Sequence, residues 1–161
     1  REWDEWFGRS IDVGGLEKER NILRYRPAST QVRGCADAKL VDVARVVAAG
    51  LLAAGDDISV CLDPSLDEGL GRALRSVGVA VTTASDEDWY ASLGASRVRL
   101  VGGNPSRAAD EADGDPDLAL WANEVTSAPQ VELLPFLREQ SVSMTAHRFG
   151  NPDAGVLSVR L

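Results

Sequence analysis

Strand-like and helix-like segments alternate between Thr30 and Gly103, and this alternation constrains the fold more than any other feature of the sequence. Short apolar runs rich in β-branched residues are separated by longer runs in which apolar side chains recur at helical spacing. Such an order is typical of a parallel sheet wrapped by helices. The sequence therefore predicts an α/β, Rossmann-like three-layer domain with a mostly parallel sheet, an extended N-terminal arm and a C-terminal tail. The expected strands are residues 29–35, 56–63, 79–84 and 96–103, and the expected helices are residues 37–55 and 65–77, with a short helix from residue 85.

Capping residues support the second and third helices. Ser65 and Glu68 have the spacing of a capping box, and Ser85 can cap the short helix through Asp88. The polar, acidic stretch 104–117 is predicted to be a solvated surface loop with some helical character. The second helix is expected to present one apolar face, made of Leu66, Leu70, Ala73, Leu74 and Val77.

The composition also divides the chain. We predict a connecting arm at residues 1–27, the α/β domain at 28–132 and the tail at 133–161. The tail is apolar and carries the only histidine in the chain, His147. It is therefore too hydrophobic for an ordinary frayed terminus.

The charge balance argues against two classes of partner. Lys and Arg number 17 against 25 Asp and Glu, a net charge of −8, whereas nucleic acids and anionic membranes need concentrated positive charge. The longest apolar run, Val46–Ala54, is about half as long as a membrane span, so no transmembrane segment is expected. With no signal peptide and no initial Met, the chain is expected to be a cytoplasmic piece of a longer protein. Cys35 and Cys61 are expected to be reduced thiols in its core.

The turn after the first expected strand decides whether the domain can hold a dinucleotide. A dinucleotide fingerprint has three glycines there, so that pyrophosphate can approach the N-terminus of the helix. This turn, RGCADAKL, has Gly34 alone, and Asp37 brings a carboxylate to the place of the phosphate. Gly34, and Asp63 at the ribose end of the second strand, are therefore only weak candidates for cofactor binding. We predict no cofactor and no metal in this chain, with NAD binding through an atypical phosphate turn as the alternative.

Catalytic signals are equally sparse. A serine or cysteine nucleophile needs a positioned base, but His147 lies far along the chain from both cysteines. We predict no catalytic residue in this chain. His147 is expected to be a structural histidine at an interface, and a pH-sensing contact is the alternative.

The tail segment FLREQSVSMTAHRFGNP resembles the C-terminal end of the bifunctional proline-utilisation (PutA) enzymes. The upstream segment FGRSIDVGGLEKERNILRYRP is similar to the stretch that follows their aldehyde dehydrogenase domain. His147, Arg148 and Phe149 depart from the family, which has small residues at their positions. The matching positions are Arg138, Glu139, Ser141, Val142, Ser143 and Thr145.

The resemblance implies a role within a larger enzyme. Members of the family oxidise proline to pyrroline-5-carboxylate with FAD, and then oxidise glutamate semialdehyde with an NAD-dependent aldehyde dehydrogenase module. Longer members carry an additional aldehyde-dehydrogenase-like domain without catalytic equipment, which acts as a lid over the tunnel between the active sites. By this resemblance, residues 1–27 follow a catalytic module and residues 28–132 are a degenerate Rossmann-like domain. The implied partners are the dehydrogenase module of the same polypeptide and a second subunit.

The tail is the predicted interaction element. We expect Val142, Met144 and Phe149 to supply apolar burial, while Arg138 and Arg148 supply hydrogen bonds. Two alternatives remain open: the tail folds back on its own domain as a last strand, or it makes the chain an oligomerisation module.

Overall fold

The computed structural model of the protein describes residues 1–148, 151–152, 155 and 158–159. The chain folds into two units. The central unit is the continuous segment Pro27–Phe136, and the terminal unit combines Arg1–Arg26 with Leu137–Leu161. Within the part of the chain that the structure describes, no helix combines the length and the apolar character that crossing a membrane requires.

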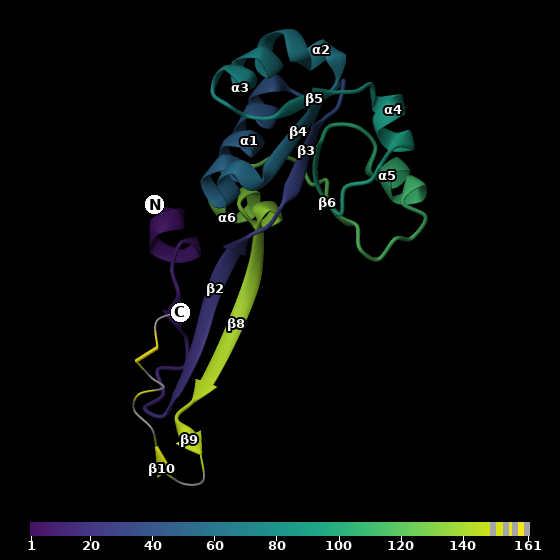
Figure 1. The fold of residues 1–161 in the computed structure, drawn as a ribbon. Helices are drawn as coiled ribbons and strands as arrows, with labels where there is room; N and C mark the ends of the chain where they lie inside the picture. The colour runs from purple at the N-terminus through teal and green to yellow at the C-terminus, as the bar shows by residue number, and fades with distance from the viewer. Residues whose placement is uncertain (149–150, 153–154, 156–157, 160–161) are drawn as a thin grey trace. The chain divides into compact units, whose positions relative to one another are not determined.

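A five-stranded sheet with order β5-β4-β3-β6-β7 forms the middle of the central unit (Figure 1). All four strand pairings are parallel. Helices cover both faces, and the predicted α/β, Rossmann-like three-layer fold is confirmed. The strands are β3 (Thr30–Gly34), β4 (Ile58–Leu62), β5 (Val81–Thr83), β6 (Arg97–Val101) and β7 (Ala119–Trp121).

Helix α1 (Leu40–Ala54) packs on one face of this sheet. Its inner side is the run of buried residues that begins with Val43 and Val46. Gly34 lets the helix approach, because a Cβ atom at Gly34 would lie 3.2 Å from Val43 and 3.0 Å from Leu62. The helix ends at Gly55, whose positive φ of 58° suits a residue without a Cβ atom.

The second helical segment runs through α2 (Pro64–Leu66), a π-helical turn η3 (Asp67–Gly71) and α3 (Arg72–Ser76). Its predicted start is wrong: Asp63, not Ser65, is the capping residue, and its carboxylate accepts a hydrogen bond from Ser65 N at 2.9 Å. Pro64 in the first turn explains this, because proline has no N–H to donate and favours the first helical position. The expected apolar face holds at Leu66 and Leu74, whereas Val77 is 72% exposed because α3 has already ended.

Two shorter helices cover the other face, α4 (Asp86–Ala91) and α5 (Pro105–Glu111). Ser85 caps α4 as predicted, accepting from Asp88 N at 3.1 Å. Helix α5 lies inside the stretch predicted to be mostly loop, where the Asn104 side chain accepts from two backbone N–H groups of the first turn. The core on this face consists of Cys35, Cys61, Trp89, Tyr90, Val98, Leu100 and Ala108.

The central unit closes with α6 (Pro129–Glu132) and a 3-10 turn η4 (Leu134–Phe136), both next to α1. The ring of Phe136 is fully buried and lies against the α1 backbone, since a Cβ atom at Gly50 would come within 2.8 Å of it. Arg99 from β6 reaches Glu132 of α6, and both side chains are buried. This ion pair and this ring therefore attach the end of the unit to its core.

The terminal unit contains a three-stranded sheet with order β1-β2-β8. The arm contributes β1 and β2, which pair antiparallel, and the tail contributes β8. The arrows of β2 and β8 point in opposite directions in Figure 1. The elements of this unit are the π-helical turn η1 (Trp3–Phe7), β1 (Ile11–Asp12), β2 (Glu19–Pro27), β8 (Leu137–Thr145), β9 (His147–Arg148) and β10 (Asn151–Pro152).

Candidate functional site

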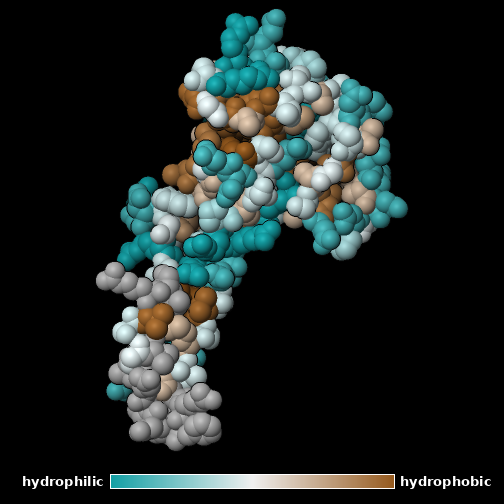
Figure 2. All heavy atoms as spheres, in the orientation of Figure 1, coloured by the Kyte–Doolittle hydropathy of each residue, from teal (hydrophilic) through white to brown (hydrophobic). Residues whose placement is uncertain are grey.

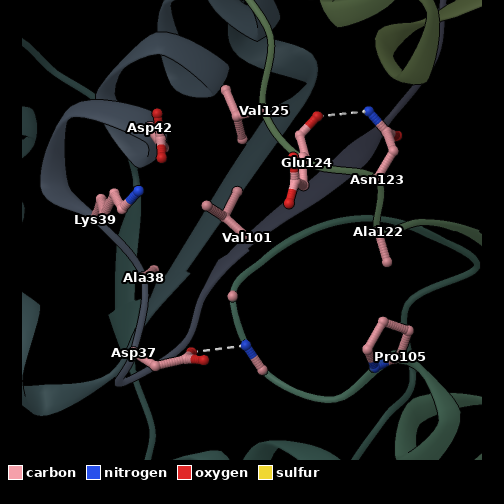
Figure 3. Close-up of a pocket in the computed structure, with 12 residues that line it drawn as sticks. Asp37, Ala38, Lys39, Asp42, Val101, Pro105, Ala122, Asn123, Glu124 and Val125 are labelled. Carbon is pink, nitrogen blue, oxygen red and sulfur yellow. Dashed lines mark hydrogen bonds between the residues drawn. The ribbon is translucent and has the colours of Figure 1, made fainter.

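A hollow of about 460 Å³ lies at the carboxyl ends of β3 and β6 (Figure 3). From β3 the chain builds the sheet outward to β4 and β5, and then returns to add β6 and β7 on the other side. This reversal is the topological switch point, where open α/β sheets usually bind their ligands. The lining comprises Asp37, Ala38, Lys39, Asp42, Val101, Gly102, Gly103, Pro105 and residues 122–125.

The Asp37 carboxylate lies at the edge of this hollow (Figure 3). Its Oδ1 accepts a hydrogen bond from Gly103 N at 2.7 Å (Figure 3). Gly102 and Gly103 both have a φ of 72°, and a Cβ atom at Gly102 would lie 2.4 Å from the same oxygen. Asp37 thus takes up a backbone N–H that a phosphate group could otherwise use.

The charges around the hollow are mainly negative. Asp37, Asp42 and Glu124 supply carboxylates, and Lys39 is the cation among the lining residues. The N-terminus of α1 also faces this end of the sheet and favours anions through its dipole. The three carboxylates repel a pyrophosphate, whereas the lysine and the helix terminus attract it. That this chain binds no dinucleotide stays a prediction, and the position of Asp37 at the hollow supports it.

The two weak candidates for cofactor binding, Gly34 and Asp63, each have a structural role in the fold. Gly34 is buried beneath α1. Asp63 does not line the hollow; its Oδ1 accepts from the Ser65 hydroxyl at 2.7 Å and from Ser65 N at 2.9 Å. The hydroxyl hydrogen bond is the main reason that the pKa of Asp63 lies below its usual value. Both residues therefore have packing or capping roles that explain their presence.

Arg33 of β3 is buried on the face of the sheet that α4 covers, away from α1, and this was not predicted from the sequence. Arg33 is fully buried, and it forms an ion pair with Asp86 at the start of α4. It also donates to the Cys61 sulfur at 3.3 Å and to the Ala84 carbonyl at 3.1 Å. The sequence did contain a sign of this ion pair, namely an arginine inside an apolar strand. Arginine is rarely buried unless it has a partner.

The cysteines beside Arg33 are free and buried, as predicted. Burial is the main cause that raises the pKa of Cys35 to about 12. The thiol is therefore protonated near neutral pH, which leaves it without the thiolate that nucleophilic chemistry needs. The contacts of Arg33 attach the start of α4 to the sheet.

The tail residues lie on the β8 strand of the terminal unit. Arg138, Glu139, Ser141, Ser143 and Thr145 are exposed, and Val142 and Met144 are half-buried. His147 and Arg148 are in β9, which pairs antiparallel with β10. Phe149, predicted to supply burial, lies outside the described residues.

Three side-chain contacts join β8 to the arm in one register. Arg24 Nε donates to Gln140 Oε1 at 2.7 Å, and the Ser143 hydroxyl donates to Asn21 Oδ1 at 2.8 Å. The Tyr25 hydroxyl reaches Glu139 at 3.5 Å. The residue numbers rise along β2 as they fall along β8, which is an antiparallel register. The tail therefore adds a strand to the sheet of the arm.

This sheet offers a surface for binding. In the described part of the chain β8 is an outer strand, and of its nine residues Leu137 alone is buried. A long outer strand with exposed faces is a template for pairing with another strand. Small two- and three-stranded assemblies also gain much of their stability from packing on something else.

Comparison of the chain with protein-family models and with curated protein sequences finds no match. Among solved structures, the chain is similar to proline utilization A (PutA) from Corynebacterium freiburgense, with a TM-score of 0.54 and 26% sequence identity. The match covers 92% of this chain and 13% of that protein. The likeness thus relates nearly the whole chain to a small part of a much longer polypeptide.

Proposed function

We propose that this chain is a non-catalytic C-terminal domain of a bifunctional, cytoplasmic proline-catabolic enzyme. In this role it supports the aldehyde dehydrogenase module and covers the path of the intermediate between the two active sites. FAD and NAD would then belong to the catalytic modules of the parent. The likeness to a part of PutA supports the pathway.

One observation carries the non-catalytic role: the hollow at the switch point is lined by the protein's own Asp37 carboxylate, hydrogen-bonded to Gly103 N. A working dinucleotide domain would keep the turn before α1 free of a carboxylate, so that phosphate could approach the helix N-terminus. The exposed β8 strand supports docking, because it can pair with or pack on the dehydrogenase module.

Truncation of the parent enzyme before Glu139 tests the docking role. We expect slower aldehyde oxidation, or release of the intermediate into solution, because most of β8 is lost. The central unit ends at Phe136 and should keep its own thermal transition, which serves as the folding control. Unchanged coupled turnover with no escape of intermediate, in a protein that keeps this transition, would refute the proposal.

An NAD-binding domain with an unorthodox phosphate turn is the second candidate, favoured by the position of the hollow. Calorimetric titration of the folded 161-residue chain with NAD⁺ separates the two. We expect no saturable heat and no thermal shift, because the Asp37 carboxylate brings negative charge to the turn where phosphate would bind. An Asp37→Ser variant, which removes the carboxylate but keeps a small polar side chain, is the matched comparison. Saturable binding by the unaltered chain would favour the second candidate.

A further inference from the structure

Helix α1 is apolar on its outer side as well as its inner side. Leu40, Val41, Leu51 and Leu52 are 52%, 60%, 37% and 54% exposed, and Ala44 and Ala48 are exposed between them. Arg45 is the charged residue of this outer stripe, and its neighbour Asp42 lies 3.4 Å away. Figure 2 shows the apolar atoms gathered over this part of the central unit.

A helix on the surface of a globular protein normally has charged and polar side chains on the face that points away from the core. An amphipathic surface helix would carry charged side chains where α1 carries leucine, valine and alanine. Beside the stripe, a groove of about 330 Å³ between α1 and residues 126–133 extends the apolar surface. The outer stripe of α1 is therefore a surface that another helix can cover.

We infer that a second copy of this chain covers the stripe, with the two α1 helices antiparallel and crossing near Ala48. The stripe is self-complementary in this arrangement. Leu52 follows Ala48 by four residues and Ala44 precedes it by four, so each Leu52 lies over the Ala44 of the other copy. A large side chain then meets a small one at two symmetric points, as an isologous interface requires.

The charges at the two ends of α1 fit the same arrangement. Lys39 immediately precedes the helix, and Asp56 and Asp57 follow its C-terminal Gly55; all three side chains are exposed. Lys39 and Asp57 lie nine residues before and nine after Ala48. Antiparallel packing therefore brings Lys39 of each copy to the acidic pair of the other. Those acids also meet the positive end of the partner helix dipole.

The expected affinity is modest. A helix of 15 residues is about 22 Å long. Such a contact buries less than the roughly 800 Å² per partner of a standard stable interface. We expect a dimer that dissociates in the micromolar range. This inference does not depend on the proposed function, since it concerns the outer stripe of α1; Lys39, which also lines the hollow, enters it only through its charge toward the other copy.

Sedimentation equilibrium of the 161-residue chain over a wide concentration range tests the inference. We expect a concentration-dependent dimer that Leu52→Glu weakens by about a hundredfold or more, because it buries an unpaired charge on Ala44. The matched control is Ala91→Glu, at an exposed position of α4 on the other face of the sheet, which should leave the dimer unchanged. Leu52 is 54% exposed, so the substitution should not unfold the domain.

A charge exchange gives an independent readout. Lys39→Glu should weaken the dimer, and combining it with Asp57→Lys should restore it, which a mere folding defect would not do. A monomer at every concentration would overturn the inference and leave the stripe to another part of a longer polypeptide. A dimer that resists Leu52→Glu, or that Ala91→Glu weakens equally, would overturn it too.

Discussion

Replacing Glu132 by alanine is expected to lower the free energy of unfolding of the central unit by about 3–5 kcal/mol, the usual cost of leaving one member of a buried ion pair without its partner. Arg99 is fully buried, and its Nη2 donates to Glu132 Oε2 at 3.1 Å. Glu132 also accepts from Thr126 N at 2.7 Å, so the same substitution leaves a second, half-buried donor without its acceptor. Urea unfolding followed by tryptophan fluorescence measures the change.

Glu87→Ala is the matched control for this substitution. Glu87 also pairs with an arginine, Arg107 at 2.8 Å, but its side chain is 76% exposed. Solvent already screens such a pair, so its removal should leave stability close to that of the unaltered chain. Equal effects of the two substitutions would mean that burial does not decide the strength of the Arg99–Glu132 pair.

Replacing Phe136 by alanine is expected to cost about 3–5 kcal/mol, because a fully buried aromatic ring is removed and the cavity collapses only in part. The ring lies against the α1 backbone at Gly50, where no side chain can move in to fill the space. Thermal unfolding should show a correspondingly lower Tm.

Leu134→Ala, in the same 3-10 turn, is the comparison for Phe136. Leu134 is 43% exposed, so its truncation should cost well under half as much. A loss at Leu134 as large as that at Phe136 would show that the turn itself, and not the buried ring, holds the end of the unit to α1.

The order of strands and helices was predictable from the sequence because each segment from Thr30 to Gly103 has a local apolar pattern. The β3, α1, β4 and β6 elements were therefore located to within a few residues. The errors arose at helix starts, where neighbouring residues compete as the cap. Asp63 caps the second helix in place of Ser65 because Pro64 follows it. Helix α5 forms in an acidic stretch because Asn104 caps it and Pro105 suits its first position.

Contacts between distant segments could not be read from local patterns. Asp37 was recognised as an obstacle to phosphate, but its partner Gly103 N is 66 residues away. The Arg33–Asp86 and Arg99–Glu132 pairs join side chains 53 and 33 residues apart. The tail was expected to dock somewhere, yet nothing local in its sequence identifies β2, more than a hundred residues earlier, as a strand beside it.

The pairing of β2 with β8 also fixes the order in which the chain can mature on the ribosome. The central unit is one continuous segment, so it can fold as soon as Phe136 has left the exit tunnel. The sheet of the terminal unit needs both ends, so β2 must wait unpaired until β8 has been synthesised. By then the folded central unit holds Pro27 and Phe136 close together through the hydrogen bond from Ala28 N to the Phe136 carbonyl at 2.9 Å. Closing the loop between the two strands therefore costs little entropy, and β8 is synthesised next to the strand with which it pairs.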